Sequence, residues 1–537
     1  MHIHGLTAQE SFYEEIEMKL KYLLGSVVAA SASIASAAFS ETVLRLDEDA
    51  VGELDPAKAS DYADSILMFN VYDTLVLPNQ GGPGHSGHLA ESWSSDGATF
   101  TFKLRDGVSF QSGNTMSAKD VVYSLERSQA LGSGLSYLFA GVSAEAVDES
   151  TVQFTLGAPN AAFVASMVRL PIVDMAYVEA NKSDEWGESL LSGTSAGTGA
   201  YSVVSHNPQE ETVMAKWDDY FLGVADVAPD TVRLRYGLEA ATVRTLIAQG
   251  EHDIASQWLP PEVIKALSDN GAQLLTETGT GAFYFKMNTT KAPLDDVNCR
   301  RALASAFDYA TAIQMIAITD DVSAGSPSTG AIPVGMFGAN GTDMVQAQDM
   351  DAAKAHMAAC SYDFADYDIE VSWIAEVPLE ERFALLMQSN FAQLGINSYI
   401  KKLPWALFAE QVSSPENTPH ISQLFVNAVT GDPDTLLYGM YHSSNPGTWQ
   451  SPEYLNDAEV DAFLEAGRAA GSEAGRQEAY AGLNARLMDL AATIYGFDRQ
   501  SVFAASNRVR VPAMTDPSKA FGLDGLGFSF RLMEMTE

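Results

Sequence analysis

Hydrophobic and polar residues alternate along several short stretches of the chain, a pattern typical of half-buried β-strands. In residues 99–104, two phenylalanines and a leucine alternate with two threonines and a lysine. The stretches 197–204 and 212–217 predict a β-hairpin. Further strands are predicted at residues 41–46, 151–156, 230–237, 282–288, 368–374 and 396–403.

Apolar residues spaced three or four apart predict helices between these strands. Ser117 precedes one such segment and Asp120 follows three residues later, which predicts a capping box at the start of the helix. Residues 299–316 share one apolar face and predict a single helix. Other helices are predicted at residues 241–250, 349–359, 380–395, 459–470 and 475–491.

Strands and helices alternate throughout the chain, so the predicted fold class is α/β with mixed sheets. A chain of 537 residues is too long for one ordinary core and predicts two or three domains. No linker rich in proline, glycine and serine divides it. We therefore expect the chain to cross between its domains more than once.

The composition is 46% hydrophobic and 19% charged, which is the balance of a globular protein. With 70 acidic and 31 basic residues, the formal net charge is −39. Such a surface repels phosphate backbones and anionic lipid, which argues against nucleic-acid binding. We interpret the charge as a solvated acidic surface rather than as a preference for cationic ligands.

The N-terminal segment has the features of a secretory signal. Lys19 and Lys21 precede an uncharged run at residues 22–40, which ends in small residues such as Ala35 and Ala37. We expect the signal to begin at Met18, with residues 1–17 as an extension of the start. The mature protein is then predicted to be exported and soluble.

The two cysteines, Cys299 and Cys360, could form a disulfide in an oxidising compartment. Each also falls on the apolar side of a predicted helix, where a lone cysteine behaves as a small hydrophobic residue. The favoured interpretation is two buried free thiols.

Patterns typical of catalytic and metal sites are weak. Ser195 lies in a G-x-S-x-G sequence, but a strand follows it where a nucleophile elbow requires a helix. His85 and His88 could bind a metal, yet no supporting ligand cluster has a recognised spacing, so a solvated loop is the favoured interpretation. We expect no catalytic residue, no metal site and no cofactor.

Two further features are typical of small-ligand pockets. Asp432 and Asp434 in the sequence GDPDT could bind a cation or an amine, although Asp-Pro-Asp is also common in turns. Some aromatic residues in predicted loops could form the walls of a pocket. These are Trp258, Trp405, Tyr441 and Trp449.

Residues 96–127, DGATFTFKLRDGVSFQSGNTMSAKDVVYSLER, resemble the signature region of family 5 extracellular solute-binding proteins, the peptide/nickel-type receptors of bacterial ABC importers. The resemblance continues in order along nearly all of the predicted mature chain, with Ala200 where the family hairpin usually has proline. The matching segments are 147–163, 193–221, 241–255, 283–309, 325–338, 352–362, 391–400 and 431–443.

The resemblance implies a periplasmic-binding-protein-like fold with two lobes, mixed sheets and an extra inserted domain. It implies a periplasmic receptor, expected to be a monomer, that captures a peptide or similar solute and delivers it to membrane permease subunits. The expected segments are 1–40 for the start extension and signal, 41–75, 193–285 and 495–537 for lobe I, 76–192 for inserted domain II, and 286–494 for lobe III.

The solute class is left open by the sequence. Dipeptide-type members place an acidic residue near the position of Val429 and some place an arginine near that of Glu376, so both dipeptide anchors are absent here. The alternatives are a neutral oligopeptide, a cationic compound, an opine, a glycoside, or nickel or a metallophore. A secreted serine hydrolase using Ser195 is the rival class. The predicted ligand contacts are Trp258, Glu376, Trp405, Thr430, Asp432 and Asp434.

Overall fold

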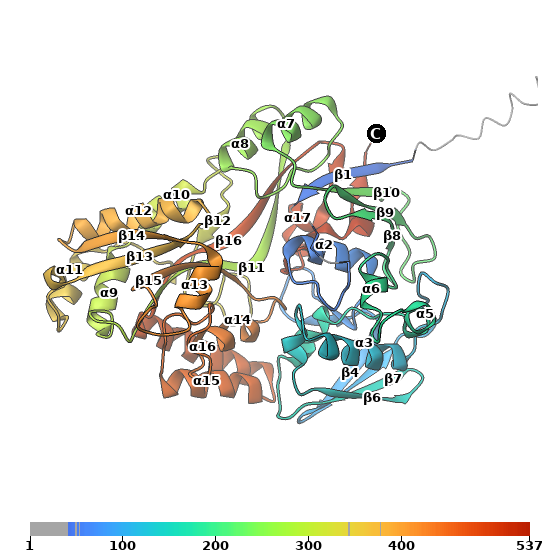
Figure 1. The fold of residues 1–537 in the computed structure, drawn as a ribbon, viewed down its shortest axis with the longest axis horizontal. Helices are drawn as coiled ribbons and strands as arrows, with labels where there is room; N and C mark the ends of the chain where they lie inside the picture. Colours follow the sequence, from blue (N-terminus) through green and yellow to red (C-terminus); the bar gives the residue numbers. More distant parts are fainter. Residues whose placement is uncertain (1–40, 49–50, 53, 342–343, 376, 537) are drawn as a thin grey trace, which may run out of the picture. The chain divides into compact units, whose positions relative to one another are not determined.

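The computed structural model describes residues 41–536 except 49, 50, 53, 342, 343 and 376 (Figure 1). The predicted signal segment lies outside the described residues. From Val43 onward the chain forms one unit that contains three principal β-sheets.

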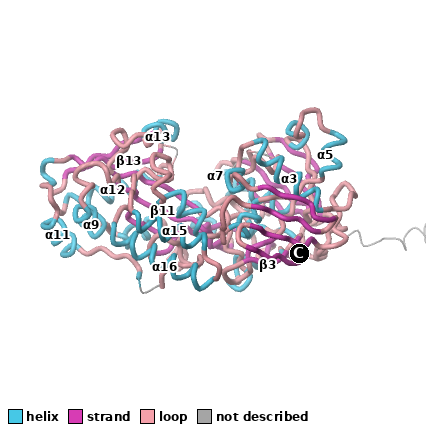
Figure 2. Tube along the Cα trace, turned by 90° about the horizontal axis from the view of Figure 1, so that it is seen from below, coloured by secondary structure: helices cyan, strands magenta, loops and turns pink. Residues whose placement is uncertain are grey.

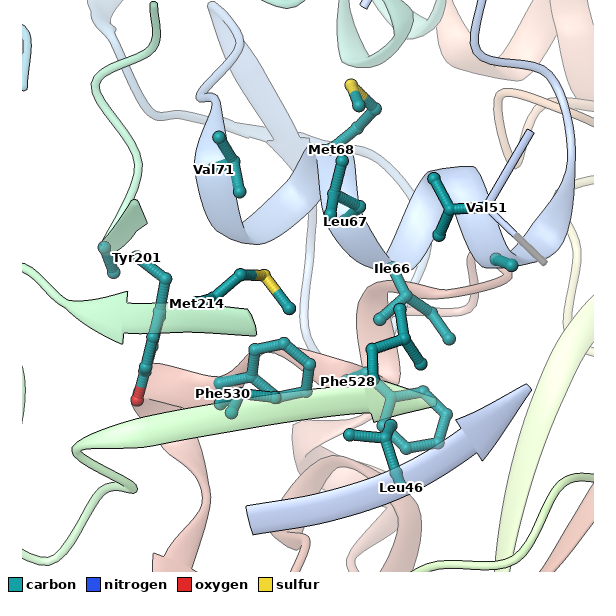
Figure 3. Close-up of a cluster of buried hydrophobic side chains, with 14 of the residues drawn as sticks. Leu46, Val51, Ile66, Leu67, Met68, Val71, Tyr201, Met214, Phe528 and Phe530 are labelled. Carbon is teal, nitrogen blue, oxygen red and sulfur yellow. The ribbon is translucent and has the colours of Figure 1, made fainter. Parts of the chain in front are cut away.

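The first sheet has four strands in the order β1-β10-β9-β8, and β1 runs parallel to β10. Helix α2 (Tyr62–Val71) packs on it, and Figure 3 shows side chains of α2 facing Leu46, Met214 and Phe530. The predicted hairpin is confirmed as β8 and β9. The strands are β1 (Val43–Glu48), β8 (Tyr201–Asn207), β9 (Glu211–Lys216) and β10 (Thr231–Tyr236).

The second sheet, of order β4-β5-β7-β6, has its own core beneath helix α3 (Ala118–Leu131). The predicted capping box is confirmed, because Ser117 N donates to Asp120 Oδ2 over 2.8 Å and the reciprocal bond is present. Phe521 and Leu526 from the C-terminal end also pack into this core. The strands are β4 (Ala90–Asp96), β5 (Thr99–Leu104), β6 (Ser143–Asp148) and β7 (Thr151–Thr155).

Shorter elements surround these two sheets. They are β2 (Val76–Pro78), β3 (His85–Gly87), α4 (Phe163–Ser166), α5 (Met175–Asn181), α6 (Glu188–Leu191), α17 (Pro512–Thr515), β17 (Val509–Arg510) and β18 (Glu534–Met535).

The third sheet has six strands in the order β12-β16-β11-β15-β13-β14. Alternate residues of β11 pack into different cores, Phe283 and Phe285 into one and Tyr284 into the other, so this sheet is buried on both faces. The strands are β11 (Gln273–Met287), β12 (Gly325–Pro327), β13 (Asp368–Ile374), β14 (Asn397–Leu403), β15 (Ile421–Asn427) and β16 (Thr493–Ala505).

Helices cover both faces of the six-stranded sheet, and Figure 2 shows α9, α11 and α12 (cyan) beside its strands (magenta). The helices on the Phe283 side are α9 (Val297–Ala306), α10 (Tyr309–Met315), α11 (Met350–Ala359) and α12 (Leu379–Ala392). Those on the Tyr284 side are α13 (Trp405–Gln411), α14 (Pro433–Tyr441), α15 (Ala458–Ala469) and α16 (Glu473–Leu490).

The long strands β11 and β16 connect two cores. At one end, Leu275 and Phe503 pack in the core of the first sheet. At the other end, Phe283 and Phe497 pack in the core of the six-stranded sheet. Helices α7 (Ala240–Gln249) and α8 (Pro261–Asp269) form a smaller cluster against β16. The two strands are therefore the structural link between the core of the first sheet and that of the third.

The prediction of one helix across residues 299–316 is wrong. Helix α9 ends at Ala306, and α10 begins after Asp308, whose Oδ1 accepts a hydrogen bond from Thr311 N over 2.9 Å. The apolar spacing continues across the break because both helices face the same core. A side-chain cap therefore interrupts a segment that hydrophobic spacing alone treats as continuous.

The interpretation of the cysteines as free thiols is also wrong. Cys299 lies in α9 and Cys360 ends α11, and the two are joined in a disulfide across a sequence separation of 61 residues. Both face the core of the six-stranded sheet, as their apolar positions suggest. The packing of α9 against α11 brings the two Cα atoms to 5.0 Å, a proximity that hydrophobic spacing does not reveal.

Candidate functional site

A cavity of about 630 Å³, here called the Trp258 cavity, lies between residues 257–264 and the six-stranded sheet with α10 and α12. Its apolar lining includes Trp258, Leu259, Ile264, Ile316, Ile318, Val377, Phe425 and Phe497. Its polar lining consists of Gln257, Glu262, Arg382, Arg499, Gln500 and Ser501. Aromatic and aliphatic walls with a few polar groups are typical of small-ligand sites.

Trp258 lies in the loop that leads into α8, where two prolines start the helix. Its backbone N–H donates to Ser256 Oγ over 3.2 Å, which holds the loop, while its side chain is 51% exposed. The Arg499 guanidinium lies 4.7 Å from the centre of the indole ring and donates to Gln257 Oε1 over 2.7 Å. The indole face and the guanidinium therefore form one surface of the cavity.

An irregularity in β11 gives Arg499 its position. The pairing of β11 with β16 shifts between Thr278 and Ala282, opposite Arg499. A Cβ atom on Gly281 would lie 3.4 Å from Arg499 Cβ and 3.3 Å from Val426 O. Bulges of this kind redirect side chains, and a glycine at this position lets the Arg499 side chain pass close to β11.

The opposite wall begins where β13 ends and α12 starts. Val377 and Pro378 line the cavity, and Arg382 follows in the first turns of α12. Glu380 points inward, and its Oε2 accepts a hydrogen bond from Ile374 N over 2.7 Å. Burial raises the pKa of Glu380 to about 8.

A second cavity of about 770 Å³, here called the Asp432 cavity, lies between residues 78–100 with 159–164 on one side and residues 430–432 with 468–476 on the other. Asp432 caps α14, with its Oδ1 accepting from Asp434 N over 3.0 Å. Arg476 Nη2 donates to both oxygens of Asp432, over 2.8 and 3.0 Å. The charge on Asp432 is therefore already paired.

A third cavity of about 410 Å³ shares Asn160 and Arg468 with the Asp432 cavity. Arg468 donates two hydrogen bonds to Asp434, of 2.8 and 2.9 Å, and its guanidinium stacks 3.2 Å from the centre of the Tyr438 ring. Burial raises the pKa of Asp434, and the adjacent Arg468 opposes that rise.

The six predicted ligand contacts are distributed among these places. Trp258 lines the Trp258 cavity, Thr430 and Asp432 line the Asp432 cavity, and Asp434 lines the third cavity. Trp405 begins α13, 5.5 Å from Trp449 between ring centres. Glu376 lies outside the described residues, next to Val377 of the Trp258 cavity.

Three lining residues, Arg499, Gln257 and Arg382, are not predicted from the sequence. Gln257 is the immediate neighbour of the predicted Trp258, so the loop was recognised but its amide was not. Nothing in the local sequence marks Arg499, because its role depends on the pairing of β16 with a strand more than 200 residues earlier.

The surroundings of Ser195 differ from those of a catalytic serine. A short helix, α6, precedes it and the strand β8 follows it. Within the described part of the chain, its one hydrogen bond is to Gln111 Oε1, over 3.5 Å. This arrangement lacks the strand-to-helix turn of a nucleophile elbow.

The interpretation of His85 and His88 as a solvated loop is wrong. His85 begins β3, and His88 is buried with its Nε2 2.6 Å from Asp73 Oδ1. Tyr220 and Thr198 donate to the same carboxylate, over 3.0 and 2.8 Å. The buried Asp73 carboxylate explains why His88 can be buried, since it supplies a hydrogen-bond partner.

One group with possible metal-binding atoms occurs among the described residues. It consists of Asp296, Cys299 and Cys360. The two sulfur atoms are joined to each other, and both oxygens of Asp296 already accept backbone hydrogen bonds. These partners occupy the atoms that a metal would need.

Comparison with known proteins decides the family. Residues 85–448, more than half of the chain, match the model described as "Bacterial extracellular solute-binding proteins, family 5 Middle". The chain belongs to this family. It is therefore a solute-binding protein, as the motif order predicted. No helix in the described stretches from residue 41 onward is long and apolar enough to cross a membrane.

The relatives of this solute-binding protein cover most of its length. It is 27% identical over 506 residues to the "Probable D,D-dipeptide-binding periplasmic protein DdpA" of Escherichia coli, which covers 91% of this chain and 94% of that protein. It is 27% identical over 428 residues to "Heme-binding protein A" of Haemophilus influenzae, covering 73% and 75%.

Solved structures confirm the predicted fold class. The ABC transporter substrate-binding protein CtaP of Listeria monocytogenes aligns with a TM-score of 0.80 and 21% identity, over 93% of this chain and 100% of that one. The periplasmic binding protein DppA of Helicobacter pylori, in complex with peptide STSA, aligns with a TM-score of 0.73 and 22% identity, over 93% and 99%.

Proposed function

We propose that this solute-binding protein captures a peptide or similar small solute in the Trp258 cavity and delivers it unaltered to the permease of an ABC importer. One observation carries the proposal. The walls of the cavity come from the α8 segment and from the six-stranded sheet, two parts of the molecule that β11 and β16 connect. A volume of about 630 Å³ suits a small organic solute.

The mechanism follows from that connection. Bending at the irregular part of β11 changes the distance between the two walls, as in hinge closure around a ligand. A solute stabilises the closed form only by the extra affinity that it has for that form. Contacts made with both walls at once, such as those with Trp258 and Val377, supply this extra affinity.

A peptide is the favoured solute because several relatives are described as peptide-binding. They include the D,D-dipeptide-binding relative, the "Dipeptide-binding protein" of Escherichia coli and the DppA structure in complex with STSA. The "Dipeptide-binding protein" is 24% identical to this chain over 413 residues. This identity is low enough for the solute to differ within the peptide-like class.

The proposed location is the periplasm. The relative DdpA is described as periplasmic, and the disulfide between Cys299 and Cys360 is a feature of proteins that work in oxidising compartments. We propose a monomer that docks on permease subunits when loaded. We also propose the predicted lobe segments as the moving parts. Because Phe283 and Phe497 pack in the core of the six-stranded sheet, we propose the hinge at the irregular pairing of β11 with β16 near Thr278 and Gln500, and not at the predicted boundaries 285/286 and 494/495.

The proposed contacts are those of the sequence prediction, divided by cavity. Trp258 is assigned to the Trp258 cavity. Glu376, which lies outside the described residues, stays a proposed contact on the sequence alone. Trp405, Thr430, Asp432 and Asp434 are proposed to contact solute only when the walls close.

Native mass spectrometry of gently purified protein tests the proposal. We expect a small solute to be released on denaturation and to raise the melting temperature when added back. Trp258→Ala should weaken its binding at least tenfold, since an aromatic wall of the cavity is lost. Tyr399→Ala is the matched control, because Tyr399 is similarly exposed, at 46%, but lies on β14 away from the cavity lining.

Two results would contradict the proposal. One is a protein that releases no solute and is stabilised by no member of a peptide and small-solute library. The other is a solute whose affinity falls equally for Trp258→Ala and Tyr399→Ala.

A further inference from the structure

The described lining of the Trp258 cavity has the opposite charge sign to that of the protein. Among the described residues, the ionisable groups that line it are Arg382, Arg499 and Glu262, two cations against one anion. The whole chain carries 70 acidic and 31 basic residues, a net charge of −39. Local positive charge inside so acidic a protein favours an anionic group on the solute.

The two arginines of this cavity differ from those of the Asp432 cavity in their partners. Arg468 and Arg476 are each bonded to an aspartate. Within the part of the chain that the structure describes, the Arg499 guanidinium donates to the neutral Gln257 amide and lies against the Trp258 ring, and no carboxylate pairs with it. Over the same residues, no hydrogen bond or ion pair holds Arg382. To reach an arginine of the Asp432 cavity, a solute carboxylate would have to displace the aspartate that is already bonded to it. To reach Arg499 or Arg382 in the Trp258 cavity, it would displace no carboxylate of the described residues.

A third donor lies beside Arg499. Gln257 Nε2 is buried and has no hydrogen-bond acceptor among the described residues, while Gln257 Oε1 accepts from Arg499. A buried donor without a partner is destabilising, so an incoming acceptor at this position is favoured. Gln257 and Arg499 both line the cavity and are bonded to each other, so their donors lie close together.

The rest of the lining is apolar. Ile316, Ile318, Phe425 and Phe497 surround the polar groups. Removing apolar surface from water stabilises a bound solute in proportion to the area buried. The solute that fits this lining has an apolar portion as well as a charged end.

We propose that the solute is an amphipathic carboxylate, such as a peptide or peptide-like acid with a hydrophobic residue at its carboxyl end. The carboxylate binds Arg499 and the Gln257 amide, and Arg382 on the opposite wall approaches it as the cavity closes. This inference rests on the proposed function and deepens it. A guanidinium suits this task because its planar set of N–H donors matches the two oxygens of a carboxylate.

The test compares two panels of tripeptides and tetrapeptides with hydrophobic C-terminal residues, one with free carboxylates and one with C-terminal amides. Affinities are measured by calorimetry for members that raise the melting temperature. The free acids should bind at least tenfold more tightly than their amides, since only the acids form charge-assisted hydrogen bonds with the arginine. Equal affinities of acid and amide would overturn the proposal.

Two variants show which residues cause the difference in affinity between acids and amides. Arg499→Gln should weaken binding of the acids at least tenfold and leave the amides nearly unchanged. Gln257→Glu should have the same effect, because its new carboxylate would pair with Arg499 in place of the solute. Arg244→Gln is the matched control, since Arg244 is an exposed arginine of α7 outside the cavity lining, and it should change no affinity.

Arg382→Gln provides an independent reading if Arg499→Gln fails to fold, because Arg382 lies on the exposed side of α12. It should weaken the acids several-fold more than the amides. If native mass spectrometry identifies a solute with no anionic group, the carboxylate proposal fails while solute capture stands. If no solute is released and neither panel binds, the proposed function fails, and this inference fails with it.

Discussion

The carboxyl group of Glu380 is buried beside the proposed binding cavity but does not line it. Its neighbours Leu379 and Arg382 line the Trp258 cavity, but Glu380 itself points inward to the Ile374 backbone N–H. Burial raises its pKa to about 8, so it holds a proton at neutral pH. Buried Glu277 and Asp498, on β11 and β16, have pKa values raised to about 7 by burial as well.

The protonation of these groups gives a pH dependence of stability. The folded state retains the Glu380 proton that the unfolded state loses near pH 4.5, so stability decreases as the pH rises from about 4.5 to 8. Glu380→Gln keeps an acceptor for Ile374 N and removes the titration. The variant should exceed the wild type in stability at pH 8 by more than about 1 kcal/mol, and this gain should shrink toward pH 5.

Chemical denaturation at pH 5, 6.5 and 8 measures this difference. Glu381→Gln is the control, because Glu381 is the exposed neighbour and loses the same charge. A gain that is equal at all three pH values, or equal in the two variants, would show that Glu380 is already ionised in the folded protein.

At the scale of elements, the irregular segment of β11 sets the geometry of the site. Gly281 lies where β11 and β16 lose their regular register, and Arg499 passes close to it. An added Cβ would be 3.3–3.4 Å from Val426 O and from two carbons of Arg499, so those neighbours would have to shift by a few tenths of an ångström. The flexible arginine yields more easily than a strand backbone.

Gly281→Ala should therefore change solute affinity more than stability. We expect a loss of affinity of about fivefold or more from displacement of Arg499, with a change in unfolding free energy within about 1 kcal/mol. Calorimetry with the co-purified solute and urea unfolding provide the two measurements. Gly157→Ala is the control because no atom lies within 4 Å of its added Cβ. An unchanged affinity for Gly281→Ala would indicate that Arg499 does not touch the solute.

The disulfide also acts between elements, because it joins α9 to the end of α11. Replacing both cysteines by alanine should lower the unfolding free energy by about 2–4 kcal/mol, since the unfolded chain gains conformational freedom. Urea unfolding of the wild type with and without dithiothreitol should show the same loss. Solute affinity should stay the same, because neither cysteine lines the cavity. A midpoint that dithiothreitol leaves unchanged would contradict this.

Local signals explain which elements could be predicted from the sequence. The capping box at Ser117 and the strand at residues 99–104 depend on neighbours a few residues away, and both are confirmed. The pairing of Cys299 with Cys360 and the position of Arg499 depend on segments that meet only in the folded chain. Aromatic residues in loops indicated Trp258, but nothing local could show that Thr430 and Asp432 line a different cavity.

At the scale of the whole molecule, two long strands join two hydrophobic cores. Leu275 and Phe503 belong to one core, and Phe283 and Phe497 to the other, although each pair comes from the same two strands, β11 and β16. Among the described residues, no named strand of the six-stranded sheet pairs with a strand of the first sheet, and isolated bridges of Ile254 with Leu46 and Ala505 connect the two sheets. We therefore expect bending of β11 and β16 to change the Trp258 cavity with little disturbance to either core. This is the arrangement that hinge closure requires.

Solute binding should therefore reduce the radius of gyration of the protein in solution. Small-angle X-ray scattering with and without saturating solute measures this change. Arg499→Gln at the same solute concentration is the control and should keep the larger value if it does not bind. Equal radii for the free and the loaded wild-type protein would contradict hinge closure.

The most direct measurement is a crystal structure of the protein with its co-purified solute. We expect one solute between the α8 segment and the six-stranded sheet, stacked near Trp258, with an anionic group bonded to Arg499 and Gln257. Density for the solute in the Asp432 cavity alone, with the Trp258 cavity empty, would contradict it.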